Sequence, residues 1–168
     1  YENCTDVVIA NGGTATCTIT NDDDIPPTVE VDKIADPTTL AEPGGSVTFS
    51  VKVHNASKEA VTLTSLVDDV YGNLDGVGTC DVPQPLAADD AAAGGDDEYA
   101  CAFTKTVAGN AGSTHKDTVT ATVVDDEQDT DTDEDDATVT ITNVDSSIVV
   151  TKTPSPARTA SIRMSGME

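Results

Sequence analysis

The sequence predicts an all-β protein whose central part is an Ig-like antiparallel β-sandwich of about seven strands. Apolar residues alternate with polar ones through several stretches, as in 47–53, which indicates strands with one buried and one wet face. Turn-rich segments separate these stretches, and no stretch keeps a helical period. Trp is absent and only 3% of residues are aromatic, so the core must rely on β-branched and aliphatic residues, which favour strands.

The expected strands follow one another along the chain. Their approximate ranges are 28–34, 46–54, 60–67, 69–71, 98–106, 116–125 and 136–143. Their inward residues all carry odd numbers: Val47, Phe49, Val51, Val53, Val61, Leu63, Val67, Tyr99, Cys101, Phe103, Val119, Ala121, Val123, Val139 and Ile141. The intervening turns are EPGG at 42–45, NASKE at 55–59, YGNLDG at 71–76, AAGGDD at 92–97 and AGNAGS at 108–113.

The chain contains an internal repeat. ATCTITNDD at 15–23 and ATVTITNVD at 137–145 match at a separation of 122 residues. After a deletion of three residues in the second copy, 29–37 aligns with 148–156, so that Lys152 corresponds to Lys33 in the repeat. A period near 120 residues is typical of whole sandwich domains. We therefore expect the C-terminal hairpin of a preceding module at 1–24, a complete sandwich at 25–144, and the first strand of a following module within 145–168, whose end at 157–168 departs from the repeat and receives no function.

Two segments carry a resemblance to known families. DPTTLAEPGGSVTFSVKVHN and TVTATVVDDEQDTDTDEDDATVTITN resemble the Ig-like conserved-repeat modules of bacterial cell-surface and secreted proteins, which occur in tandem and lack known catalysis. YENCTDVVIANGGTATCTITND resembles the end of the prealbumin-like modules of pilin and adhesin stalks. The resemblance implies a non-catalytic, extracellular spacer whose partners are adjacent modules of its own chain, with any host or matrix ligand bound through other domains.

Charge and motifs restrict the class of function. The net charge of −23 disfavours nucleic acid and anionic membrane surfaces as partners. No nucleophile elbow, phosphate loop or dinucleotide fingerprint occurs, so we do not expect an enzyme. His54 and His115 lack metal-ligand spacing and are expected at the surface. The excess of Asp also leaves open a surface-layer protein of a halophile.

Four cysteines allow three disulfide pairings. Loop closure favours the sequential pairing, Cys4 with Cys17 and Cys80 with Cys101. Four unpaired thiols are the alternative. Disulfides would place the chain in an oxidising compartment, outside the cell.

Calcium is the one cofactor that the acidic segments suggest. In the predicted loop 125–136, Asp129, Asp131 and Asp133 stand at alternate positions and could converge on a hard cation if the loop curls. Asp22, Asp23 and Asp24, at the junction between the first and second expected modules, could bind a calcium ion in the same way. The stretch ITNDDD is similar to the calcium-binding junctions of Calx-β and cadherin-like repeats, although the glutamate motifs of those repeats are absent. A solvated acidic loop is the alternative interpretation.

Strand parity also suggests a covalent crosslink of the kind known in pilin-type modules. Lys33 and Asn143 share the parity of the inward residues of their strands. A buried Lys would be neutral and nucleophilic, and Asp117 or Glu59 could supply the proton for its attack on the Asn amide. The alternative is a Lys that extends to solvent from a sheet edge and an Asn that completes a turn.

Overall fold

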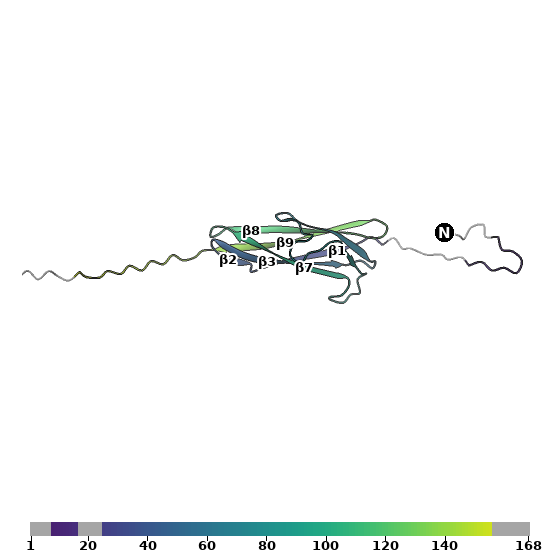
Figure 1. Cartoon of the computed structure of the whole chain (residues 1–168), viewed down its shortest axis with the longest axis horizontal. Helices are drawn as coiled ribbons and strands as arrows, with labels where there is room; N and C mark the ends of the chain where they lie inside the picture. The colour runs from purple at the N-terminus through teal and green to yellow at the C-terminus, as the bar shows by residue number, and fades with distance from the viewer. Residues whose placement is uncertain (1–7, 17–24, 156–168) are drawn as a thin grey trace, which may run out of the picture.

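The computed structural model describes residues 8–16 and 25–155, and these contain nine strands and no helix (Figure 1). The strands are β1 (Val29–Asp36), β2 (Thr39–Ala41), β3 (Gly44–Asn55), β4 (Val61–Asp68), β5 (Gly72–Asn73), β6 (Gln84–Leu86), β7 (Glu98–Ala108), β8 (Thr114–Val124) and β9 (Thr130–Thr142). Within the described residues there is accordingly no helix that could span a membrane.

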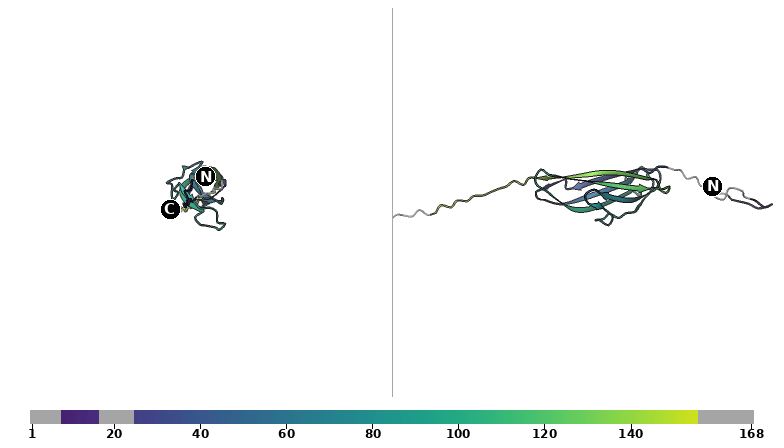
Figure 2. Two further views of the ribbon diagram at one scale, coloured as in Figure 1. Left: turned by 90° about the vertical axis from the view of Figure 1, so that its right-hand side faces the viewer. Right: turned by 90° about the horizontal axis from the view of Figure 1, so that it is seen from above.

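The strands form two sheets that face each other as a sandwich (Figures 1 and 2). One sheet has the order β1-β3-β7, and the other has the order β2-β9-β8-β4-β5, with β6 also paired to β4. All pairs except β2 with β9 are antiparallel. The predicted all-β, antiparallel fold class is confirmed.

The predicted alternation fills the core. Long strands bury every second side chain because successive residues point to opposite faces of a sheet. Tyr99, also predicted to point inward, is half-buried. The residues that are buried as predicted are Val47, Phe49, Val51, Val53, Val61, Leu63, Cys101, Phe103, Val119, Ala121, Val123, Val139 and Ile141. Phe49 and Phe103 face each other across β3 and β7 with ring centroids 5.3 Å apart. The two phenylalanines are the fully buried rings of this core, whose other buried hydrophobic members are aliphatic residues and the disulfide cysteines.

Strand β4 breaks the alternation, and the prediction that Val67 is buried is wrong. The pairing of β4 with β8 shifts between Leu63 and Ser65, which is a β-bulge. A bulge inserts one extra residue and reverses the parity of everything after it. Leu66 and Asp68 consequently point inward, at 0% and 1% exposure, while Val67 is 41% exposed.

Other predicted boundaries also need correction. The expected strand at 69–71 is a turn, and the short β5 follows it instead. Strands β2 and β6 have three residues each, too few for an alternating pattern to show in the sequence. The predicted acidic loop is wrong as well, because most of it belongs to β9, which begins at Thr130.

The acidic half of β9 lies along the edge of β1. Val29, Val31 and Lys33 donate their backbone N–H groups to carboxylate oxygens of β9. The acceptors are Asp131 at 2.8 Å, Asp133 at 2.8 Å and Asp135 at 2.7 Å, in that order. Each pair is 102 residues apart, so β1 and β9 run in the same direction. This carboxylate ladder satisfies backbone donors on the edge of β1 and ties the two sheets together.

Because β1 and β9 run parallel, the chain enters and leaves the sandwich at opposite ends. The chain enters β1 beside the start of β9 and leaves from the far end of β9. Figures 1 and 2 show the segment after Thr142 leaving the sandwich at the end opposite to the start of β1. Residues 143–155 form no strand, and Ile148, Val149 and Val150 are at least 84% exposed.

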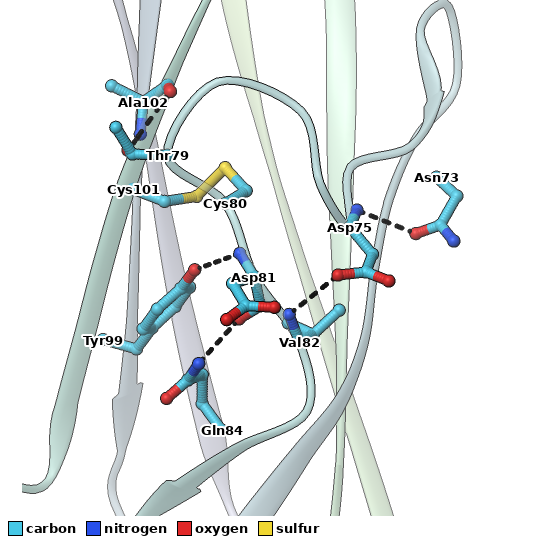
Figure 3. The surroundings of a disulfide bond; sticks show 10 residues. All are labelled: Asn73, Asp75, Thr79, Cys80, Asp81, Val82, Gln84, Tyr99, Cys101 and Ala102. Carbon is cyan, nitrogen blue, oxygen red and sulfur yellow. Dashed lines mark hydrogen bonds between the residues drawn. A yellow bond between two sulfur atoms is a disulfide. The ribbon is translucent and has the colours of Figure 1, made fainter.

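A disulfide attaches the loop between β5 and β6 to β7 (Figure 3). Cys80 and Cys101 are joined with an Sγ–Sγ distance of 2.06 Å, which confirms this half of the predicted pairing. Beside it, Thr79 donates its N–H to the Ala102 carbonyl, and Ala102 donates its N–H to Thr79 Oγ1, both at 2.9 Å. The loop thus covers the free edge of β7. The other predicted pair, Cys4 with Cys17, lies outside the described residues.

Candidate functional site

The core contains a lysine held between two aspartates. Lys33 lies in the middle of β1, opposite Val51, and is 4% exposed. Its Nζ is 2.5 Å from Asp68 Oδ2 on β4 and 2.6 Å from Asp117 Oδ2 on β8. Its backbone N–H is bonded to Asp135. Lys33 therefore joins the smaller sheet to three strands of the larger one.

Asp68 is fixed by the turn that follows it. The bulge in β4 directs this side chain inward. Its Oδ1 accepts backbone N–H bonds from Val70 at 2.9 Å and Tyr71 at 2.8 Å, so only Oδ2 faces the lysine. An aspartate that caps the turn after its own strand in this way has little freedom to rotate. The bulge and the turn together set the position of the carboxyl carbon.

Asp117 has a different environment. It is 0% exposed, and its Oδ1 is buried without a hydrogen-bond partner among the described residues. Burial raises the pKa of Asp117, while the bond from Lys33 and the lysine's positive charge oppose the rise. With all three groups ionised, the Lys33, Asp68 and Asp117 cluster holds one excess negative charge in an apolar place. Protonation of Asp117 removes that excess.

Aromatic rings enclose the triad formed by Lys33, Asp68 and Asp117. The Phe49 ring centroid is 5.1 Å from Lys33 Nζ, and that of Phe103 is 6.0 Å away. Tyr71 packs against both rings at 5.7 Å, and its hydroxyl meets His115 Nε2 at 3.0 Å. Burial, and then repulsion from Asp117 and Asp68, raises the pKa of Tyr71 to about 12.

The chain has only two Phe and three Tyr, and three of these five rings surround the triad. Such scarce bulky residues, gathered here, exclude water and strengthen every charge interaction inside.

The triad is expensive as a purely structural device. Removing each charged group from water costs several kcal/mol of desolvation free energy, which the attraction between the charges must offset. A hydrophobic cluster of equal volume is often as stable. The arrangement has two chemical capacities that a hydrophobic cluster lacks. It holds β1 against β4 and β8 in one geometry, and it brings an amine to a carboxyl group in a dry site.

The structure brings together only part of the predicted crosslink. Lys33 and Asp117 are buried and adjacent as predicted. The prediction that Asn143 is the acceptor is wrong, because Asn143 lies beyond β9, is exposed and donates to Asp145 Oδ1. Glu59 is also not at this site, since it precedes β4 and Asp68 ends it.

Sequence reasoning missed Asp68. The parity of Val61 and Leu63 places residue 68 on the outer face. The available signal was the spacing of three between Leu63 and Leu66, two apolar residues that cannot share a face without a bulge.

The predicted calcium ligands are engaged elsewhere or kept apart. Asp131 and Asp133 accept bonds from β1 and lie along an extended strand, so they do not converge on one point. Asp129 is exposed in the turn before β9. The calcium prediction for these three residues as one site is therefore wrong. Asp22, Asp23 and Asp24 lie outside the described residues.

Two other groups of side chains could hold a cation. Glu59, Asp125 and Glu127 each offer a carboxylate oxygen, and these atoms lie within 4.8 Å of one another. Asp125 is 5% exposed, and its Oδ2 is buried without a hydrogen-bond partner in the described structure. A shared hydrogen bond with Asp126, followed by desolvation, raises the pKa of Glu127 to about 7.

The second group consists of His54, Asp89 and Asp97. It is less open to a cation because Lys58 Nζ already lies 2.5 Å from Asp89 Oδ2. His54 and His115, both predicted at the surface, are half-buried.

No family model matches this sequence, and no curated protein sequence is significantly similar to it.

Proposed function

We propose that this chain is a structural spacer from an extracellular bacterial surface protein, with an Ig-like repeat module between two neighbours. The observation that carries the proposal is the course of β1 and β9, which places entry and exit at opposite ends of the sandwich. Modules joined in this way extend one after another, as a stalk requires. The partners are then the adjacent modules of the same chain, and no catalytic step is assigned.

Force applied to the two ends would load the β1–β9 contact in shear. The two strands are parallel neighbours, and a pull would draw the start of β1 away from the end of β9. Shear loads all hydrogen bonds of the carboxylate ladder at once, whereas peeling breaks them one at a time. The resistance of a spacer depends on its unfolding barrier, and this geometry raises that barrier.

The segment after β9 supports a module that continues. The internal repeat aligns Ile148 and Val150 with Val29 and Val31 of β1. The side chains of Ile148 and Val150 are exposed here, and a following sandwich would bury them as it does those of β1.

The disulfide supports a location outside the cell. Structural disulfides such as Cys80–Cys101 are typical of proteins in oxidising compartments and rare in the cytosol. The net charge of −23 fits a surface that is kept apart from nucleic acid and anionic lipid.

Single-molecule force spectroscopy on the whole chain tests the spacer proposal. Handles at positions 26 and 146 pull on opposite ends of the sandwich, whereas handles at 26 and 127 pull on the same end and peel β1 from β9. We expect a clearly higher unfolding force for the first pair. Equal forces in the two geometries would contradict a load-bearing role.

A calcium-binding joint is a second candidate function, favoured by the buried Asp125 Oδ2. Glu59, Asp125 and Glu127 lie before β4 or after β8, at the end where the chain enters. A cation there would neutralise three carboxylates and stiffen the junction with a preceding module. We expect millimolar calcium to raise the Tm, EDTA to reverse the effect, and Asp125→Asn to abolish it. An unchanged Tm in the unsubstituted chain would remove this candidate.

A further inference from the structure

We propose that Lys33 and Asp68 form an intramolecular amide bond, with Asp117 as the proton carrier. The bond joins Lys33 Nζ to Asp68 Cγ and links β1 of one sheet covalently to β4 of the other. It depends only on the buried triad and not on the spacer role.

The first support for the bond is proximity. Nζ of Lys33 is 2.5 Å from one oxygen of the Asp68 carboxyl group, and both side chains have no exposed surface. Lys33 is held by backbone pairing to β3 and by Asp135, while Asp68 is held by its turn. Two reacting groups fixed in this way behave as if present at very high concentration.

The two aspartates are not equivalent, and Asp68 is the better acceptor. When an amine attacks Cγ, negative charge develops on the carboxyl oxygen that remains. In Asp68 that oxygen is Oδ1, which already faces the N–H groups of Val70 and Tyr71. These two donors can stabilise the developing charge as an oxyanion hole does. The other oxygen, Oδ2, faces Lys33 and is the one that leaves.

Asp117 suits the role of proton carrier. Its Oδ2 lies 2.6 Å from the attacking nitrogen. Its Oδ1 accepts no hydrogen bond in the described structure, and His115 Nε2 lies 3.9 Å from it, beyond hydrogen-bonding distance. A buried carboxyl group in this position retains a proton more readily than one in water. It can therefore donate a proton and take one back within the same site.

The proton balance closes without a co-reactant. The ammonium of Lys33 first passes one proton to Asp68 Oδ2, which leaves a neutral amine and a neutral acid. The amine attacks Cγ, and the protonated Asp117 gives its proton to the departing Oδ2, which leaves as water. Asp117 then recovers a proton from Nζ. The sum is one ammonium plus one carboxylate giving one amide plus one water, with Asp117 unchanged.

The surroundings favour the amide over the ion pair. Phe49, Phe103 and Tyr71 keep water from the triad, which protects the amide from hydrolysis. Bond formation also removes one positive and one negative charge from the core, and with them the cost of their burial.

Intact mass of the purified chain, unfolded and fully reduced, tests the proposal. We expect a mass about 18 Da below that of the sequence, because one water is lost when the amide forms. Reduction matters because each remaining disulfide would subtract a further mass of about 2 Da. A mass equal to that of the sequence would overturn the proposal.

A tryptic digest then identifies the acceptor. Trypsin does not cleave after an acylated Lys33, so the product should be peptide 1–52 joined to peptide 59–105, which contains Asp68. Linkage of 1–52 to 117–152 instead would show that Asp117 is the acceptor and overturn the assigned roles. Separate peptides 1–33 and 34–52 would show that no bond forms.

Substitutions separate the roles of the three side chains. Lys33→Met and Asp68→Ala should each restore the full mass, as should Asp117→Ala if the variant folds by circular dichroism. Lys116→Arg is the matched control, because Lys116 is a surface residue paired with Asp136. A folded Asp117→Ala chain that still lacks one water would refute the proton-carrier role.

Discussion

Lys33 Nζ lies 2.5 Å from Asp68 Oδ2, although the two residues are 35 positions apart and belong to opposite sheets. This contact crosses the whole thickness of the core. It is possible because a bulge in β4 turns Asp68 inward and because β1 places Lys33 directly opposite. The stability of the sandwich should therefore depend strongly on these two residues.

Removal of the lysine should destabilise the fold severely. Lys33→Met leaves the carboxyl groups of Asp68 and Asp117 buried without their lysine partner, and an uncompensated buried charge of this kind costs about 3–5 kcal/mol. Urea denaturation of the whole chain measures the loss. Lys116→Met is the control, since the pair of Lys116 with Asp136 is exposed to solvent and contributes little to stability. Similar losses for the two variants would show that the triad does not stabilise the fold.

The carboxylate ladder should protect individual amides of β1. Asp133→Ala removes the acceptor of the Val31 N–H group, which should cost about 1 kcal/mol and speed the hydrogen exchange of that amide. Asp133→Asn keeps an oxygen acceptor and should have a smaller effect. Glu134→Ala, on the exposed face of β9, serves as the control. An unchanged hydrogen-exchange rate of the Val31 amide in Asp133→Ala would refute the carboxylate ladder.

Asp117 should give a stability profile that rises toward acid. Burial raises the pKa of Asp117 in the folded chain above its unfolded value, so the folded state binds the proton more tightly. The contribution of Asp117 to the free energy of unfolding is complete below its pKa in the unfolded chain, about 3.9. It is lost as the pH rises through the pKa of Asp117 in the folded chain.

The comparison of unsubstituted chain with Asp117→Asn isolates this contribution. Free energies of unfolding, measured by urea from pH 4 to pH 8, should differ between the two proteins in a pH-dependent way. The unsubstituted chain should lose more stability across the window in which Asp117 ionises. Parallel profiles would show that Asp117 has the same pKa in the folded and unfolded states.

The Cys80–Cys101 disulfide should contribute substantially to stability. It closes a loop of 21 residues, and chain-entropy reasoning gives about 3 kcal/mol for such a loop. The double variant Cys80→Ser, Cys101→Ser should lower the free energy of unfolding by that amount while leaving Cys4 and Cys17 in place. Chemical denaturation of both proteins provides the comparison, and an unchanged midpoint would contradict the estimate.

The part of the fold that could be predicted from sequence is the part that depends on local alternation. Phe49, Lys33 and Asp117 were placed in the interior because their strands keep a strict period of two. The rule failed at Asp68, where one inserted residue reverses the parity of the strand. The spacing of Leu63 and Leu66 was the one sign of that bulge in the sequence, and its position becomes definite only when β4 pairs with β8.

The acidic segment shows a second limit of sequence reasoning. High charge and the absence of apolar residues favour a loop at 125–136, yet most of this segment belongs to β9. Its aspartates are ordered by backbone donors of β1, a strand 102 residues earlier in the chain. Hydrogen bonds to so distant a strand produce no pattern of apolar and polar residues in either segment, so the sequence alone does not reveal them.

The account depends most on Lys33 being enclosed between Asp68 and Asp117. NMR of the whole chain with ¹⁵N at the lysine side-chain nitrogens tests this directly. We expect one lysine Nζ to stand apart, as a slowly exchanging amide that carries a single proton and shows contacts to the Phe49 ring. If every lysine instead gave the rapidly exchanging ammonium signal of a solvent-exposed side chain, the buried triad and the crosslink built on it would both be contradicted.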